Sequence, residues 1–432
     1  MQKFDMNWCL GSRAAHPLRL LALVGPLTWL ACTSNELPHD ELTTSTNASG
    51  GNAATGGQSA SGGAASGGDN GGGGALVSSG GSGGETVDSA GGAEGSGGGP
   101  TNHEKKTYVY VGSGAFGGSE GRIIIYVYDR ATYSLTRVDK IESGGLASSL
   151  AIDVEAGRLY AGEESRTGVR SFAIDRATGK LTDLGITESM GSPVYVTLSP
   201  NKDFLLAANY TQGNVDVYPI SQEGKAEPSL ATTPTGAHAH YIGINAQNQV
   251  MVANKGANTI SLFTFDNGVL TPSSPPTVAT ESPRHIFRKD NKAYVVSENA
   301  DLITAYTVES NGALSEDWTT TRLMGGDPNK DTGADIHVTP SGKYLYASNR
   351  GASNTLVAYD ISSGMPTYLE HESTLGEIPR NFAVDPLEQA VIVGNQKSNT
   401  VVTFAIAADG GLDHKTTIDV GYPPFFIAIA IF

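Results

Sequence analysis

One strand pattern recurs seven times along the C-terminal part of this 432-residue chain. In each copy, a short apolar strand follows a small residue or proline, and a second apolar strand ends at a polar residue. Equivalent positions at the start of the first strand lie 44 to 50 residues apart, at Ser148, Val194, His240, Arg284, Ala334, Arg380 and Phe425. A repeat of about 40 to 50 residues with four strands is typical of a β-propeller blade. The period therefore predicts an all-β, seven-bladed β-propeller over residues 105–432.

The two ends of the repeat region predict how the ring closes. The first blade lacks its first strand and begins at Thr107–Gly112, whereas the chain ends with an unpaired apolar strand at Phe425–Ile431. Pairing of the C-terminal strand with the N-terminal blade would complete that blade and remove an open sheet edge. We expect seven blades closed in this way, and a count of six or eight blades is the alternative.

Residues 1–32 have the features of an export signal. A basic start is followed by a 12-residue apolar run at 20–31, which is shorter than the roughly 20 residues that a membrane-spanning helix needs. The run ends in Trp29-Leu-Ala-Cys32, which resembles the lipobox of bacterial lipoproteins. We therefore expect an exported protein of the bacterial cell envelope that touches the membrane only through a lipid on Cys32. An ordinary signal peptide cut nearby is the alternative.

Residues 33–104 have a different composition from the repeats. The segment from Gly50 to Gly99 holds 22 of the 55 glycines, and no Lys or Arg lies between Thr33 and Thr101. Such a sequence cannot bury enough apolar surface to offset its conformational entropy, so we expect a disordered tether.

Charge, cysteine content and motifs exclude several classes of protein. The chain has 44 acidic against 28 basic residues, which argues against a nucleic-acid partner. Its two cysteines exclude a disulfide framework or a Cys-rich zinc module. His238-Ala-His240 would suit a transition metal, but the spacing supplies no third ligand. With no P-loop or dinucleotide fingerprint either, we predict a monomer with no metal and no cofactor.

The repeat register predicts which residues face one mouth of the central channel. Neighbouring strands run in opposite directions, so the start of each innermost strand and the end of the next strand reach the same face. The strand-end positions are Glu164, Tyr210, Lys255, Glu298, Arg350 and Gln396. The residue type changes from blade to blade on a constant scaffold, which is typical of a site built on a symmetric fold. Solvated loop residues around an open channel are the alternative.

The charges on this rim predict the class of ligand. Four cationic side chains come to one face of an acidic protein, namely Lys255, Arg284, Arg350 and Arg380. Arginine matches carboxylates and phosphates in a bidentate manner, so we expect a small anionic ligand. The same rim carries three candidate acid–base groups, His240, Glu164 and Glu298. His285 and His337 fall at other positions of the repeat, and we interpret them as packing or supporting residues.

Six short motifs are ordered along the chain in a recognisable way. They are His238-Ala-His240, Ser282-Pro-Arg-His285, Tyr294-Val-Val-Ser-Glu298, and the segments 334–342, 345–350 and 378–382. Together they resemble the lactonase family of seven-bladed propellers, which includes bacterial 6-phosphogluconolactonases and fungal carboxy-cis,cis-muconate cyclases. The catalytic set proposed for the muconate branch is a histidine, two arginines and a glutamate. The resemblance implies that the matching residues here are His240, Arg284, Arg350 and Glu298.

Two functions follow as hypotheses. The first is a lactone hydrolase acting on a sugar-derived or carboxylated lactone, in which arginines stabilise the oxyanion and Glu298 and His240 share the roles of base and acid. The remaining rim residues, assigned to substrate binding, are Glu164, Tyr210, Arg380 and Gln396. An exported chain is not expected to meet a cytosolic phosphorylated sugar. The second hypothesis is a surface-tethered propeller that binds a ligand or a protein without turnover.

Overall fold

The computed structural model describes residues 105–116, 120–165 and 168–432. The predicted export signal, Cys32 and the 33–104 linker lie outside these residues, so those predictions remain predictions. In the described part of the chain, no helix is long and apolar enough to span a membrane.

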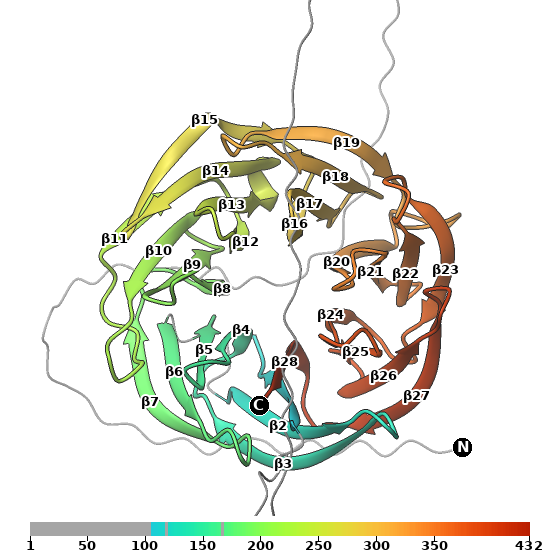
Figure 1. Cartoon of the computed structure of the whole chain (residues 1–432), viewed down its shortest axis with the longest axis horizontal. Coiled ribbons are helices and arrows are strands. Elements are labelled where there is room, and N and C mark those ends of the chain that lie inside the picture. Colours follow the sequence, from blue (N-terminus) through green and yellow to red (C-terminus); the bar gives the residue numbers. More distant parts are fainter. Residues whose placement is uncertain (1–104, 117–119, 166–167) are drawn as a thin grey trace, which may run out of the picture. The chain divides into compact units, whose positions relative to one another are not determined.

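Seven four-stranded antiparallel sheets surround a central axis, which confirms the predicted seven-bladed propeller (Figure 1). The innermost strands are β4 (Ala147–Asp153), β8 (Pro193–Leu198), β12 (Ala239–Ile244), β16 (Pro283–Lys289), β20 (Asp331–Val338), β24 (Pro379–Val384) and β28 (Pro424–Ile431). The second strands are β5 (Arg158–Glu163), β9 (Phe204–Asn209), β13 (Gln249–Asn254), β17 (Lys292–Ser297), β21 (Tyr344–Gly351), β25 (Ala390–Asn395) and β1 (Thr107–Ser113).

The two outer positions of each blade complete the sheets. The third strands are β6 (Gly168–Ile174), β10 (Asn214–Pro219), β14 (Thr259–Asp266), β18 (Ile303–Val308), β22 (Thr355–Asp360), β26 (Thr400–Ile406) and β2 (Arg122–Asp129). The outer strands are β7 (Leu181–Glu188), β11 (Ala231–Pro234), β15 (Val269–Ala279), β19 (Leu314–Thr320), β23 (Thr367–Ser373), β27 (Leu412–Asp419) and β3 (Ser134–Glu142). A short 3₁₀ turn, η1 (Lys255–Ala257), follows β13. We number the sheet β28-β1-β2-β3 as blade 1 and the others as blades 2 to 7 in chain order.

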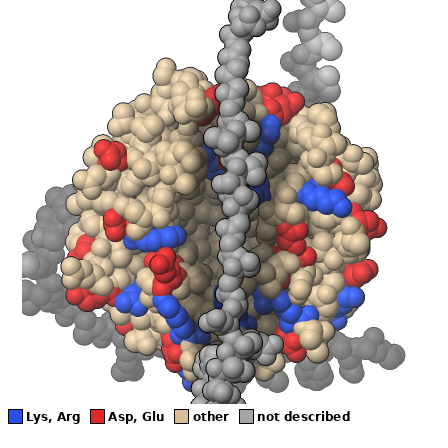
Figure 2. Space-filling view, in the orientation of Figure 1, with Lys and Arg blue, Asp and Glu red and all other residues tan. Residues whose placement is uncertain are grey.

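The apolar core lies between neighbouring blades rather than along the central axis. One buried cluster joins Val296 and Ile303 of blade 5 to Ile336 and Leu345 of blade 6. Because the inner strands carry apolar residues on both faces, each sheet packs against two neighbours. The space-filling view shows a hollow at the middle of the ring with basic side chains at its edge (Figure 2).

The ring closes as the sequence predicts. The C-terminal strand β28 pairs antiparallel with β1, with Thr107 opposite Ile431 and Val111 opposite Ile427. Beyond the strands, the backbone N–H groups of Lys106 and Phe432 each donate to the other's carbonyl at 2.9 Å. These bonds remove the free edge that β1 would otherwise present.

A β-bulge occurs at the same point in every blade and positions the channel-mouth residues. The register between the inner and second strands slips once in each blade, at Ser148, Val194, His240, Arg284, Ala334–Asp335, Arg380 and Phe425. A bulge leaves its extra residue out of the ladder and re-aims its side chain. The residues predicted to start the inner strands are therefore the ones freed from the regular alternation of the sheet.

Candidate functional site

A single carboxylate organises the predicted rim. Glu298 directly follows β17, and its Oε1 lies 2.8 Å from the Nζ of Lys255. Its Oε2 lies 3.0 Å from the Nε of Arg284 and 3.4 Å from an Nη of Arg350. These three cations come from blades 4, 5 and 6. Glu298 thus joins cationic side chains that the sequence separates by about a hundred residues.

These cations determine the charge state of Glu298. Burial alone would raise the pKa of its carboxyl, but Arg350, then Arg284 and Lys255, outweigh burial and lower the pKa to about 2. A carboxyl with this pKa stays ionised at any ordinary pH. Glu298 therefore acts as a fixed negative charge that holds three cations in place.

The arginines remain in excess over the carboxylate. Burial, followed by repulsion from Arg350 and Arg380, lowers the pKa of Arg284 to about 9. Burial and repulsion from Arg350 likewise lower the pKa of Arg380 to about 10. Both groups are still cationic near pH 7, but their mutual repulsion is unfavourable. A bound anion would relieve this repulsion.

His240 lies beside this cluster as a neutral base. It is buried at the start of β12, and its Nδ1 has no hydrogen-bond partner among the residues that the structure describes. Its ring approaches the rings of Tyr210 and His285, with centroids 5.5 and 5.2 Å away. Burial, then Arg284, His285, Arg380 and Lys255, hold the pKa of His240 well below its usual value. The imidazole is therefore neutral near pH 7.

Glu164 occupies the same repeat position as Glu298 but has a different environment. It directly follows β5, its Oε2 is buried, and no hydrogen bond or ion pair holds its carboxyl group in the described part of the chain. Burial raises the pKa of this carboxyl, although Arg380 and Arg284 act in the opposite direction. The rim thus contains two carboxyl groups with opposite tendencies to ionise.

The remaining predicted binding residues border the cluster. The Tyr210 ring stacks on His238 with centroids 4.5 Å apart, and the Nζ of Lys255 lies 5.5 Å from its centre. The guanidinium of Arg380 lies over the ring of Phe425 at 4.9 Å. Gln396 lines a separate cavity of about 550 Å³ together with Phe425. Gln396 therefore lies at the margin of the charged cluster, next to an apolar surface.

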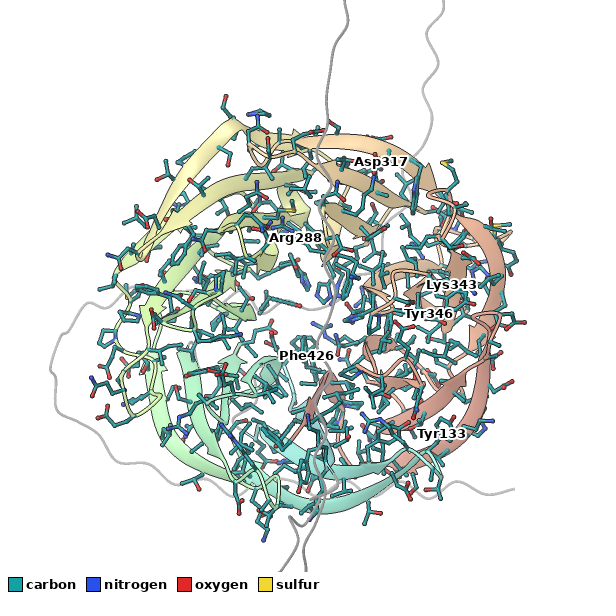
Figure 3. All side chains as sticks on the ribbon, in the orientation of Figure 1. Tyr133, Arg288, Asp317, Lys343, Tyr346 and Phe426 are labelled. Carbon is teal, nitrogen blue, oxygen red and sulfur yellow. The ribbon has the colours of Figure 1, made fainter. Side chains whose placement is uncertain are left out.

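An aromatic layer lies one residue further along the inner strands and forms the floor of the site. The Tyr195 ring contacts the rings of Tyr241, His285 and Phe426, with centroids 4.7, 5.2 and 5.9 Å away. Figure 3 shows Phe426 close to the central axis. These residues come from blades 3, 4, 5 and 1, so the layer crosses the channel beneath the rim.

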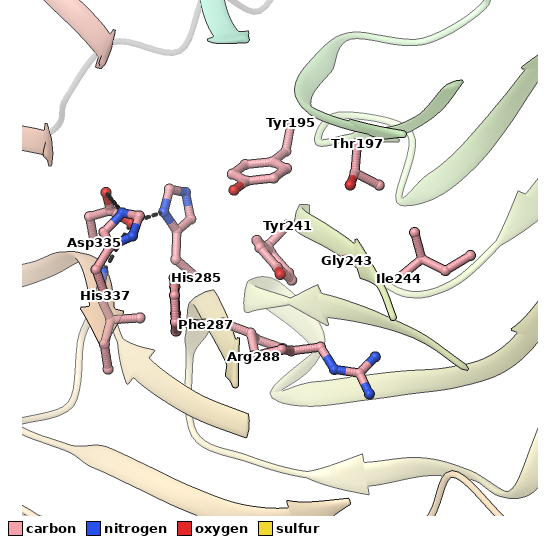
Figure 4. A pocket seen from close by; sticks show the side chains of 12 residues that line it. Tyr195, Thr197, Tyr241, Gly243, Ile244, His285, Phe287, Arg288, Asp335 and His337 are labelled. Carbon is pink, nitrogen blue, oxygen red and sulfur yellow. Dashed lines mark hydrogen bonds and ion pairs between the residues drawn. The ribbon is translucent and has the colours of Figure 1, made fainter. Parts of the chain in front are cut away.

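A buried aspartate fixes the orientation of His285 in this layer. The His285 Nδ1 lies 2.7 Å from Oδ1 of Asp335, and the His337 Nε2 lies 3.1 Å from Oδ2 (Figure 4). Burial alone would raise the pKa of Asp335, but His337 and His285 lower it well below its usual range. An ionised carboxylate only accepts hydrogen bonds, so the Nδ1 of His285 carries the proton. Its Nε2, 3.3 Å from an Nη of Arg284, is then an acceptor that helps to orient this arginine.

A cavity of about 260 Å³ extends from this layer toward the far ends of the inner strands (Figure 4). Thr197, Gly243 and Arg288 line it on the side away from the rim. In the described part of the chain, no group of three His, Cys, Asp or Glu side chains is arranged to hold a metal ion.

Residues 108–427 match the model of the family described as lactonase, 7-bladed beta-propeller. The chain belongs to this family. The match covers all seven blades and every rim residue named above, so the resemblance inferred from the six motifs is confirmed.

Several curated relatives of this lactonase-family chain are named 6-phosphogluconolactonase. The Bacillus subtilis protein is 29% identical over 336 residues, which cover 73% of this chain and 96% of the relative. The Formosa agariphila protein is 30% identical over 315 residues, which cover 65% of this chain and 87% of the relative. The solved structure of a periplasmic gluconolactonase from Pseudomonas aeruginosa superposes with a TM-score of 0.70 at 24% identity, covering 76% of this chain and 99% of that one. This last similarity shows the shared fold.

The lactonase propeller brings most of the predicted rim residues into one cluster. His240, Arg284, Glu298 and Arg350 meet within it, and Lys255 joins them through Glu298. Sequence reasoning missed Asp335 as the group that orients His285, and Tyr195 as the floor. Tyr195 lies one residue after the bulge of blade 3, and Asp335 lies within the bulge of blade 6. The position that follows each inner-strand start was therefore the sequence signal that could have identified them.

Proposed function

We propose that this protein hydrolyses a lactone that carries a negatively charged or polyol group. One observation carries the proposal. His240 is buried and neutral, and it lies beside four cationic side chains whose total charge exceeds that of their carboxylate partner, Glu298. Membership of the lactonase family and the names of the relatives support the reaction class.

His240 is the base in this proposal. It takes a proton from water while the oxygen of that water attacks the lactone carbonyl. The surrounding cations oppose protonation of His240 in the free protein. Once the negative charge of the substrate lies among them, that opposition weakens and proton transfer becomes easier. Substrate binding and activation of the base are therefore coupled.

Arg284 and Arg350 stabilise the negative charge that develops on the carbonyl oxygen. Both are held in place before substrate arrives, by Glu298 and by the carbonyl groups of Ala334 and Gly333, to which they donate hydrogen bonds. Preorganised donors of this kind lower the barrier because they need no reorientation during the reaction. Glu298, with a pKa of about 2, serves as their counter-charge and transfers no proton.

The borders of the cluster support a substrate with one charged and one less polar end. Arg380 lies over Phe425 and Phe116, with its guanidinium 4.9 and 5.4 Å from the ring centres. An anionic group of the substrate would pair with the arginines, and its carbon skeleton would contact the aromatic rings. A sugar-derived or carboxylated lactone has this character.

We also propose that the protein is exported and attached to a bacterial membrane by a lipid on Cys32. The apolar run at 20–31, the motif that ends at Cys32 and the Gly-rich segment after it support this location. Replacement of Cys32 by Ala should release the protein from the membrane fraction. Retention of Cys32→Ala in that fraction would contradict lipid attachment.

A panel of purified lactones tests the reaction class. Neutral sugar lactones, lactones with a carboxylate and lactones with a phosphate should be incubated with the propeller, and ring opening measured by acid release. Turnover of at least one charged or sugar-derived lactone is expected. Ligand-induced thermal stabilisation without turnover of any member would instead favour the binding propeller.

A further inference from the structure

The proposed hydrolysis includes a second proton transfer, to the ring oxygen that leaves. When the tetrahedral intermediate collapses, the ring C–O bond breaks and its electron pair goes to the ring oxygen. An alkoxide is a poor leaving group, so this oxygen needs a proton as the bond breaks. Glu298 cannot supply one because three cations keep it ionised. The His240 imidazolium, formed when His240 takes the proton from water, is one candidate donor, and a second carboxyl group on the rim is the other.

Glu164 is this second rim carboxyl group, and its backbone position is well fixed. Its backbone is fixed on both sides, because its N–H donates to Leu146 at 3.1 Å and its carbonyl accepts from Ser192 at 3.2 Å. Its buried Oε2 has no hydrogen-bond partner in residues 105–116, 120–165 and 168–432. A structural glutamate would be expected to have such a partner when an oxygen is buried.

Two arginines act electrostatically on both rim carboxyl groups. Arg380 interacts with both Glu164 of blade 2 and Glu298 of blade 5, and Arg284 also acts on both. The two carboxyl groups therefore approach the same arginines from different blades. In active sites with two carboxyl groups, the protonated one commonly acts as the general acid, and the ionised one supplies a negative charge.

We propose that Glu164 is the general acid that protonates the ring oxygen as it leaves. The proposal rests on the proposed lactone hydrolysis and assigns a step within it. The Glu164 proton moves to the ring oxygen, the carbonyl re-forms, and the product is a hydroxy acid. The His240 imidazolium then returns a proton to the Glu164 carboxylate, directly or through solvent, so both groups regain their starting states. The raised pKa of Glu164, caused by burial, is consistent with a stored proton.

Substrates with different leaving groups test this role. The Glu164→Gln variant should be compared with the unaltered protein on an aliphatic lactone, which releases an alkoxide, and on dihydrocoumarin, which releases a phenoxide. A phenoxide leaves without help from an acid. We expect kcat for the aliphatic lactone to fall by about 100-fold or more, and kcat for dihydrocoumarin by less than about fivefold.

Further variants separate this role from a structural one. Glu164→Asp keeps a carboxylic acid and should recover part of the lost kcat on the aliphatic lactone. Glu377→Gln alters an exposed glutamate before β24 and should leave both rates unchanged. Equal losses on both substrates, or a higher KM with unchanged kcat, would overturn the assignment of Glu164. If the unaltered protein hydrolyses neither substrate nor any other lactone, the proposed function itself fails.

Discussion

Oε2 of Glu298 lies 3.0 Å from Nε of Arg284, whose side chain is 2% exposed, whereas that of Glu298 is 15% exposed. This ion pair joins the end of β17 to the start of β16 within blade 5. It is extended to blades 4 and 6 by Lys255 and Arg350. The geometry of the rim therefore depends on one carboxylate.

Replacement of Glu298 by Gln should impair both catalysis and folding. The change removes the counter-charge but keeps the shape, so three cations are left to repel one another. We expect kcat/KM to fall by about 100-fold, as when a group that preorganises charge is lost. The free energy of unfolding should fall by about 3 kcal/mol, since an unpaired buried charge is costly. Steady-state kinetics and urea unfolding measure the two effects.

Glu316→Gln, an exposed change in the same blade, is the control. Equal behaviour of the Glu298→Gln and Glu316→Gln variants would contradict the role of Glu298.

Replacement of Arg380 by Ala should change which lactones the protein prefers. In the described part of the chain, Arg380 interacts electrostatically with Glu164 and Glu298 but forms no direct ion pair, so it is free to contact a substrate anion. Loss of one charged hydrogen bond of about 1.5–3 kcal/mol raises KM by roughly 10- to 100-fold. This increase is expected for a carboxylated lactone, whereas a neutral lactone should change by less than about threefold. A parallel change for both substrates would rule out recognition of the anion by Arg380.

The pH dependence of the reaction should show the depressed pKa of His240. Because burial and nearby cations lower this pKa, His240 stays an active base well below pH 6.5. In the free protein, kcat/KM should fall only as the pH drops through the lowered pKa of His240. A bound anion raises this pKa, so the acid limb of kcat should lie at higher pH than that of kcat/KM. If kcat and kcat/KM both fell with an acid limb near pH 6.5, burial and nearby cations would not be lowering the pKa of His240.

Removal of the Asp335 carboxylate should destabilise the whole ring. Five donors bond to it: ring nitrogens of His285 and His337, the side-chain amide of Asn381 and the backbone N–H groups of Ile336 and Phe382. In Asp335→Ala these donors lose their acceptor, and each fully buried donor left without a partner costs about 1–3 kcal/mol. Thermal unfolding should show a large loss of stability, and the exposed Asp413→Ala should show none.

Acidification should destabilise the fold because it protonates the Asp335 carboxylate. The folded-state pKa of Asp335 is lowered, so its stabilising contribution is present above the unfolded-state pKa and is lost as pH falls toward the folded-state value. The drop in unfolding free energy on acidification should therefore be smaller in Asp335→Asn than in the unaltered protein. An equal drop in the two proteins would assign acid sensitivity to other groups.

The sequence predicted the blades because each blade is a local pattern. Strands, turns and the 46-residue period lie within short segments, so the register placed Glu164, Glu298 and Arg350 at equivalent positions without reference to the fold. The closing pair of β28 with β1 was also predictable, since the first blade visibly lacked a strand.

The properties that distinguish equivalent residues were not predictable. Glu164 and Glu298 are the same residue type at the same repeat position, yet only Glu298 receives cations from both neighbouring blades. Asp335 bonds to partners 50 and 46 residues away, in blades 5 and 7. Such contacts depend on how the bulged residues project between blades, which the repeat pattern does not contain.

The effect of His240→Ala on lactone hydrolysis tests the central claim most directly. The variant should be assayed on the best lactone of the panel at pH 7, with the exposed His414→Ala as the matched control. Loss of a general base lowers kcat by about 100-fold or more, and we predict this loss for His240→Ala alone. A kcat for His240→Ala within about twofold of the unaltered protein would contradict a catalytic site at this channel mouth.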